Sequence, residues 1–116
     1  MLSQSDKNSA NRAKKMSDAF YAQNLLRQAF PEQKYGSVKA AIFAAHRVIS
    51  KHVSKDFTQR RVRSIRDGTA RRIDSEEMEA IKAALIEEER REQRELRARL
   101  ASLDEKIAAF EASTHR

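Results

Sequence analysis

The sequence contains no cysteine and no tryptophan, and it has only two glycines and one proline among 116 residues. The absence of cysteine excludes disulfide bonds and thiolate metal sites. The scarcity of glycine and proline removes the turn residues that a many-stranded sheet needs, whereas alanine, leucine, glutamate, lysine and arginine favour helices. We therefore expect an all-α protein, built as a small helix-turn-helix-like bundle with a long C-terminal coiled-coil helix.

Long apolar runs are also lacking. The longest, residues 40–45, is far shorter than a membrane span or the core of a secretory signal. We therefore expect a soluble, cytoplasmic protein that has no membrane partner and that would be nucleoid-associated in a bacterium.

Motifs for catalysis and for metal binding are missing as well. Gly36 and Gly68 stand in unrelated contexts and form no phosphate-binding loop, and no serine or threonine lies in a recognisable nucleophile motif. His46, His52 and His115 have no carboxylate at a useful metal-ligand spacing. We expect no enzyme activity, no cofactor, no metal and no small-molecule substrate.

The net charge of +7 is unevenly distributed along the chain. Residues 1–74 carry 16 Lys or Arg against 6 Asp or Glu, a balance of +10, whereas residues 75–116 carry 8 against 11, a balance of −3. Such an asymmetry indicates a basic part that meets a polyanion and a mixed-charge part with another role. The simpler alternative is a basic surface that is only solvated.

The pattern of apolar residues divides the chain into three parts. Residues 1–16 have no apolar periodicity and are predicted to form a disordered basic and polar arm. Residues 17–86 are predicted to form a helical DNA-binding domain whose first two helices span about 18–30 and 38–53. Residues 87–116 are predicted to form a C-terminal helix for oligomerisation through a coiled coil.

The third predicted helix is short and dense in arginine. Thr58 is a suitable N-cap, Phe57 has the spacing to pack on Val62, and Gly68 supplies the left-handed residue that commonly closes a helix. Helical geometry turns Val62 and Ile65 inward. This arrangement suits a recognition helix, because the inner residues fix the angle of entry while outer side chains reach base edges in a major groove.

We therefore predict two sets of DNA-contacting residues. The base-contact candidates are Gln59, Arg60, Arg63 and Ser64. The phosphate-contact candidates are Lys51, Lys55, Arg61, Arg66, Arg71 and Arg72.

A fourth helix is predicted to begin where Asp74 and Glu77 form a capping-box pair, and it can continue to about Ala112 without glycine or proline. Its second half has apolar residues at alternating intervals of four and three, the a/d pattern of a coiled coil. These residues are Leu96, Leu100, Leu103, Ile107 and Phe110. We expect them to pair with a second copy of the chain in a homodimer that binds double-stranded DNA.

Residues 58–85 resemble the second half of a Cro/repressor-type helix-turn-helix domain. The resemblance is carried by TQRRVRSIRDG at residues 58–68 and by RIDSEEMEAIKAAL at residues 72–85. In that family a recognition helix ends at a glycine, a loop follows, and another helix packs behind it. The resemblance implies a small regulator of transcription that reads duplex DNA.

Two other partners fit the same residues. Arginine-rich helices also enter RNA grooves, so the chain could bind RNA. A coiled-coil adaptor or assembly factor could dock its basic segment on an acidic protein surface. Aromatic residues are scarce among the arginines, which disfavours stacking on single strands.

Overall fold

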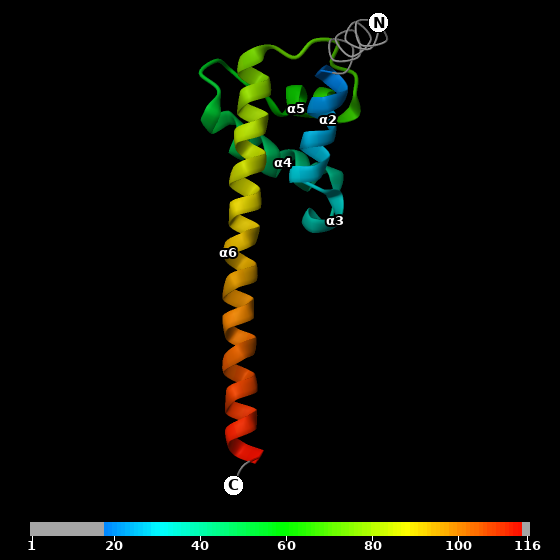
Figure 1. The fold of residues 1–116 in the computed structure, drawn as a ribbon. Helices are drawn as coiled ribbons and strands as arrows, with labels where there is room; N and C mark the ends of the chain where they lie inside the picture. Colours follow the sequence, from blue (N-terminus) through cyan, green and yellow to red (C-terminus); the bar gives the residue numbers. More distant parts are fainter. Residues whose placement is uncertain (1–17, 115–116) are drawn as a thin grey trace, which may run out of the picture. The chain divides into compact units, whose positions relative to one another are not determined.

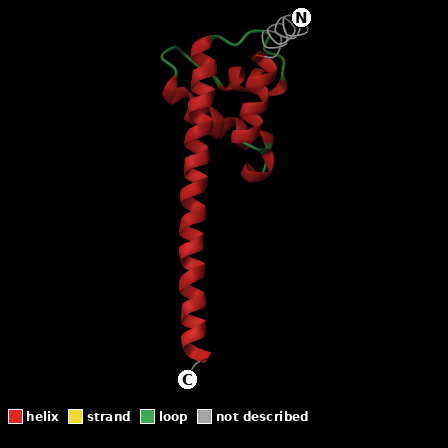
Figure 2. Cartoon of the chain, viewed as in Figure 1, coloured by secondary structure: helices red, strands yellow, loops and turns green. Residues whose placement is uncertain are grey.

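The computed structural model describes residues 18–114, and the predicted arm at residues 1–16 lies outside them. The described residues form helices joined by loops, without a strand (Figures 1 and 2). The helices are α2 (Asp18–Ala29), α3 (Glu32–Tyr35), α4 (Val38–Ile49), the short 3-10 helix η1 (Ser50–His52), α5 (Gln59–Asp67) and α6 (Ser75–Thr114). The predicted all-α class is confirmed.

The chain divides into two compact units, Met1–Leu85 and Ile86–Arg116, which we call the N-terminal and C-terminal units. The division lies one residue from the boundary that the sequence predicts after residue 86. Helix α6 begins in the N-terminal unit and supplies the described part of the C-terminal unit.

Helix α2 buries the apolar face that its sequence predicts, including Leu26, and Phe30 directly after the helix is also buried. The helix ends at Ala29, two residues before Pro31, which cannot donate the backbone hydrogen bond that a continuing helix needs. Pro31 is instead the N-cap of the four-residue helix α3, which the sequence analysis did not predict.

Helix α4 begins as predicted after Ser37, whose hydroxyl accepts a hydrogen bond from the backbone N–H of Ala40 at 3.1 Å. Its predicted end at Val53 is wrong, because α4 stops at Ile49 and continues only as η1. The hydroxyl of Ser50 donates to the carbonyl of Arg47, a local bond that competes with regular helix geometry. Val53 is extended and only half-buried.

Helix α5 has the boundaries that its capping residues predict. The Thr58 hydroxyl accepts a hydrogen bond from the Arg61 N–H at 3.1 Å, and Gly68 closes the helix at a φ of 80°. The residue before the cap, Phe57, is buried, and its carbonyl lies 2.7 Å from Nε2 of His46 on α4. The loop between α4 and α5 is therefore anchored to α4.

The core of the N-terminal unit combines side chains from four places in the sequence. The largest fully buried ones are Phe30, Leu26, Ile49, Ile65, Ile81 and Val62. They come from α2 and the residue that follows it, from α4, from α5 and from the first turns of α6. Helix α5 thus packs its inner side on a common core.

The predicted capping box at the start of α6 is present. The Glu77 N–H donates to Oδ1 of Asp74 at 2.8 Å, and the Asp74 N–H donates to Oε1 of Glu77 at 3.2 Å. In the C-terminal unit the apolar residues of α6 are exposed. Among residues 18–114, none of the helices combines the length and the apolar character required to cross a membrane.

Substitution of the two glycines tests how Gly68 ends helix α5. Gly68→Ala would force a left-handed alanine and place its Cβ 3.0 Å from Nε2 of Gln23, whose amide donates to the Arg66 carbonyl. Gly36→Ala is also strained, at a φ of 91°, but its Cβ meets nothing within 4 Å. We expect Gly68→Ala to lower the free energy of unfolding by about 2 kcal/mol and Gly36→Ala by about 1 kcal/mol. Urea denaturation followed by circular dichroism measures both, and equal losses would contradict the role of Gln23.

Candidate nucleic-acid interface

Helix α5 exposes the residues that the sequence assigns to base contacts. Gln59, Arg60 and Arg63 are exposed, and we call these three the outer face of α5. Ser64 is half-buried at the margin of this face, and its backbone carbonyl accepts hydrogen bonds from the residues that follow Gly68. The predicted side chains therefore lie on the side of α5 opposite the core.

The arginines of the outer face are not neutralised within the described chain. Neither Arg60 nor Arg63 makes an ion pair or a side-chain hydrogen bond with any residue from 18 to 114. The carboxylate of Asp67 stands on the same helix and is exposed, but it forms no ion pair with them. Two guanidinium groups thus remain with their planar sets of donors available to a ligand.

Arg61 has a different role, because it joins α5 to the first turn of α6. Its Nε donates to Oε2 of Glu77 at 2.8 Å, and its Nη2 donates to Oε1 at 2.9 Å. The same Nη2 also donates to the backbone carbonyl of Arg72. The Glu77 side chain is only 3% exposed. The Nε and Nη2 donors of Arg61 are thus committed to the fold, so Arg61 has a structural role and is not proposed as a phosphate contact.

The electrostatics of this pair follow from its geometry. The hydrogen bonds from Arg61 hold the pKa of the Glu77 carboxyl below its ordinary value, against the opposing effect of burial. The same bonds raise the pKa of Arg61. Both groups therefore stay charged at neutral pH, and the pair is partly shielded from solvent.

The assignment of Arg66 to phosphate is wrong. Arg66 is only 7% exposed, and its Nη1 donates to the carbonyl of Phe30 at 2.8 Å. Its own carbonyl accepts from Nε2 of Gln23 at 2.9 Å. Burial and the nearby charge of Arg27 lower the pKa of Arg66. Arg66 thus fixes the end of α5 against α2 instead of meeting solvent.

The sequence held a signal for the structural roles of Arg61 and Arg66. At 100° per residue, each lies about 70° from the middle of the inward side defined by Val62 and Ile65. Arg60 and Arg63 lie further away, on the outer side. A long side chain so close to the buried side can turn inward once a carboxylate or a carbonyl is available.

The remaining phosphate candidates lie in the segments that precede and follow α5. Lys51, Lys55, Arg71 and Arg72 are exposed. Lys55 forms an ion pair with Asp74, which raises the pKa of Lys55 and lowers that of Asp74. Because both groups are about half exposed, this pair is weak and screened, and a phosphate can compete for the lysine.

The histidines and carboxylates of the described residues form no metal-binding cluster. Among residues 18–114 no group of three or more His, Asp or Glu side chains is placed to hold a metal ion. His46 instead stacks on Phe57, with ring centroids 6.4 Å apart. This histidine therefore packs the loop that precedes α5.

Compared with protein-family models, curated proteins and solved structures, the chain shows no significant match to any of them.

Arg66 is buried and Arg63 is exposed, so their replacement should have different effects on the free energy of unfolding. Arg66→Ala removes a buried hydrogen bond and leaves the Phe30 carbonyl without its partner, so we expect a loss of about 2 kcal/mol in the free energy of unfolding. Arg63→Ala removes an exposed side chain and should change that free energy by less than about 0.5 kcal/mol. Thermal and urea denaturation of both variants test the distinction, which equal stabilities would refute.

The Arg61–Glu77 pair predicts how stability depends on pH. Because the pKa of Glu77 is lowered in the folded state, its contribution is present above its ordinary pKa of 4.5 and is lost as pH falls through the lower folded value. We expect Glu77→Gln to be less stable at neutral pH and to lose less stability on acidification. The control Glu79→Gln changes an exposed carboxylate and should keep the pH dependence of the native chain. Urea denaturation at a series of pH values measures this, and an unchanged acid dependence in Glu77→Gln would exclude the pair as its source.

Proposed function

We propose that this protein binds double-stranded DNA in a sequence-specific manner and acts as a small dimeric regulator of transcription. The observation that carries the proposal is the outer face of α5, where Arg60 and Arg63 are exposed without a partner in residues 18–114. Both flanks of the same helix are fixed by hydrogen bonds from Arg61 and Arg66. A helix held at both flanks with an arginine outer side is suited to insertion into a major groove.

Each exposed side chain has a chemical role in this proposal. Arginine donates two parallel hydrogen bonds to the O6 and N7 atoms of guanine, so Arg60 and Arg63 are the proposed base readers. Gln59 and Ser64 are proposed to contact neighbouring base edges. Lys51, Lys55, Arg71 and Arg72 are proposed to contact phosphates on either side of the groove.

Duplex DNA is favoured over the other partners on the same observations. The arginines proposed to read bases lie on one short helix of about the width that a B-form major groove admits, whereas the major groove of a regular, uninterrupted A-form RNA duplex is too narrow for such entry. An acidic protein partner would also be attracted by the charge, but it would not require arginines presented from a helix held at both flanks. A regulator of this kind would act in the cytoplasm, and on the nucleoid in a bacterium. It needs no cofactor and carries out no catalysis.

The experiment compares two double variants that remove the same charge. Arg60→Ala with Arg63→Ala should lower the preference for a selected duplex over random duplexes by about 10- to 100-fold, since each lost bidentate contact removes discrimination. The control is Arg27→Ala with Arg47→Ala, which removes two exposed arginines from α2 and α4. The control should leave the preference within about threefold, because neither arginine belongs to the proposed interface and a general loss of positive charge weakens binding similarly for all sequences.

Fluorescence anisotropy at several salt concentrations measures both effects. Phosphate contacts should give a linear fall of log affinity with log salt concentration. The proposal would be wrong if the α5 variant kept its full preference, or if the native chain preferred single strands or double-stranded RNA of the same length.

A further inference from the structure

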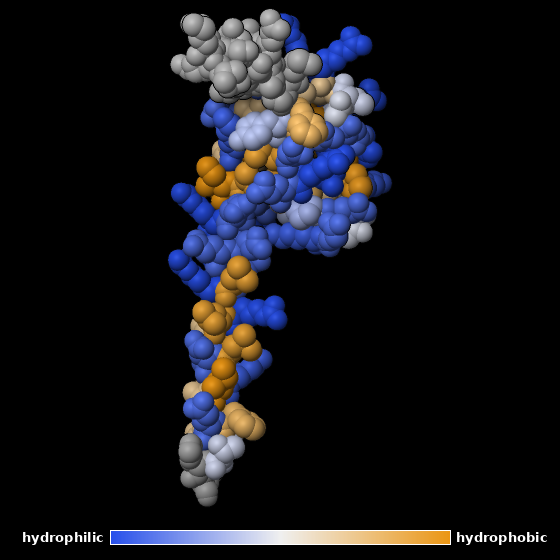
Figure 3. Space-filling view, turned by 45° about the vertical axis from the view of Figure 1, so that its right-hand side comes forward, coloured by the Kyte–Doolittle hydropathy of each residue, from blue (hydrophilic) through white to orange (hydrophobic). Residues whose placement is uncertain are grey.

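The C-terminal unit carries an apolar stripe that none of residues 18–114 covers. Its residues are 45–70% exposed, and Figure 3 shows hydrophobic side chains gathered along this unit between charged ones. The members of the stripe are Leu96, Leu100, Leu103, Ile107 and Phe110. With Leu96 at a d position, the intervals place Leu100 and Ile107 at a positions and the other two at d positions.

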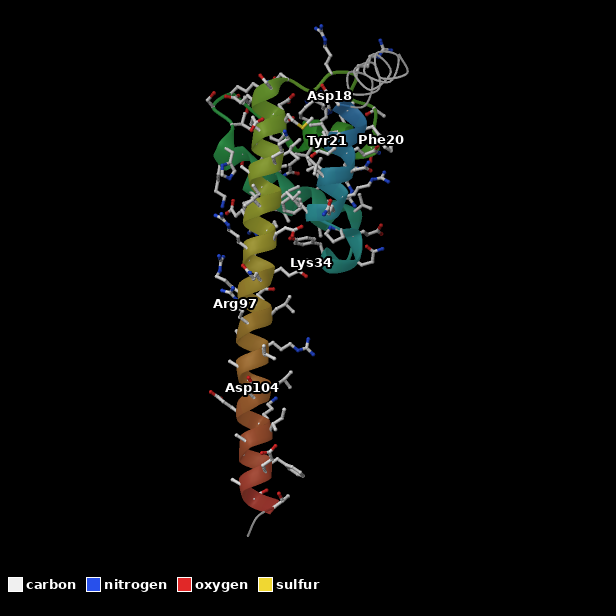
Figure 4. All side chains as sticks on the ribbon, in the orientation of Figure 1. Asp18, Phe20, Tyr21, Lys34, Arg97 and Asp104 are labelled. Carbon is white, nitrogen blue, oxygen red and sulfur yellow. The ribbon has the colours of Figure 1, made fainter. Side chains whose placement is uncertain are left out.

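Charged residues flank this stripe in a regular pattern. Residues at g and e positions lie beside an a/d seam and face the partner helix in a coiled coil. The g positions hold Glu92, Arg99 and Lys106, and the e positions hold Arg97, Asp104 and Glu111. Arg97 and Asp104, both labelled in Figure 4, stand one heptad apart on α6.

We propose that the C-terminal unit pairs with a second copy of this chain as a parallel, in-register, two-stranded coiled coil. In that arrangement each g residue lies opposite the e residue five positions later on the other chain. The three resulting combinations all join opposite charges: Glu92 with Arg97, Arg99 with Asp104, and Lys106 with Glu111. Symmetry repeats all three, so no flanking pair between Glu92 and Glu111 is repulsive.

An antiparallel pair is less well matched. Aligning Leu100 with Leu103 of the second chain makes e positions face e positions and g positions face g positions. Arg97 then meets Asp104 and Arg90 meets Glu111, which is favourable, but Arg99 meets Lys106, which is repulsive, so only the parallel pair avoids repulsion. The charges therefore specify the parallel orientation.

The flanking charges are also free to make these bonds. None of the six forms an ion pair within the part of the chain that the structure describes. Arg91, which lies on the side away from the stripe, behaves differently and pairs along the helix with Glu88 and Glu95, at 3.6 Å in each case. The intrachain pairs thus lie away from the proposed seam.

The sequence also sets where the seam begins. One heptad before Leu96 the d position holds Glu89, and two glutamates would face each other there in a parallel pair. Close packing between the two helices is therefore expected from Leu96 to Phe110, and both helices run through this segment in the same direction. This inference deepens the proposed function, since it rests on the dimer assumed there.

Because the native chain has no cysteine, introduced thiols report the orientation directly. Ile107→Cys should shift to a disulfide-linked dimer under mild oxidation of the full-length protein, because the two sulfurs meet across a parallel seam. In the antiparallel pair residue 107 faces residue 96, and two copies of residue 107 stand about 16 Å apart along the axis. The matched control Ala108→Cys lies one residue away, on the side opposite the seam, and should remain unlinked.

Two further outcomes would overturn the proposal. A mixture of Leu96→Cys and Ile107→Cys chains that links only between the two variants would show antiparallel pairing. A monomeric mass for the native chain in light scattering would exclude the dimer. Both measurements are made without DNA. A result against parallel pairing would therefore not count against DNA binding by α5, and a failure to bind DNA would not change the cross-linking result.

Charge reversal tests the same orientation with the apolar seam intact. Arg99→Glu with Lys106→Glu, and separately Asp104→Lys with Glu111→Lys, should each weaken self-association by about tenfold. Their equimolar mixture should regain dimerisation, because parallel pairing then joins opposite charges at all four altered positions. Failure of the mixture to associate more tightly than either variant alone would contradict the parallel register.

Discussion

The position of α5 depends on the ion pair between Arg61 and Glu77. One carboxylate caps the start of α6 through the Asp74 N–H and also accepts two hydrogen bonds from Arg61. The first turn of α6 and one flank of α5 are therefore fixed by the same group. On the other flank, Arg66 and Gln23 tie the end of α5 to α2 and to the Phe30 carbonyl. With both flanks held and Val62 buried beneath, the outer face of α5 has a defined direction.

The arginines of α5 thus divide into two groups, which helical geometry separates by angle but whose partners the sequence alone does not identify. The inner pair, Arg61 and Arg66, satisfies a buried carboxylate and a backbone carbonyl. The outer pair, Arg60 and Arg63, has no such partner in the described chain. In the proposed function the bonds of Arg61 and Arg66 hold α5 rigid for Arg60 and Arg63, because bidentate recognition of a base edge requires a guanidinium at a set angle.

Local signals in the sequence were sufficient to predict the capping residues of α4, α5 and α6 and the buried faces of the helices. Thr58, Gly68 and the Asp74–Glu77 box make capping bonds to residues only a few positions away, so residue type and spacing are enough to predict them. The burial of Arg66 was missed because its partner carbonyl belongs to Phe30, which is distant in the sequence. The early end of α4 was missed because the bond from the Ser50 hydroxyl to the Arg47 carbonyl leaves no trace in the apolar pattern. The four-residue helix α3 was missed because it has no buried residue and therefore no apolar periodicity.

The proposed coiled-coil pairing belongs to the C-terminal unit and the proposed entry into a DNA groove belongs to the N-terminal unit, so the two are tested separately. Selection of the full chain against a random duplex library at low and at moderate salt tests the entry into a DNA groove, which is the central claim, most directly. The account predicts one enriched motif, rich in guanine, that is recovered at both salt concentrations, with weaker total binding at the higher one. Retention of duplexes without any enriched motif, or no retention even at low salt, would contradict it.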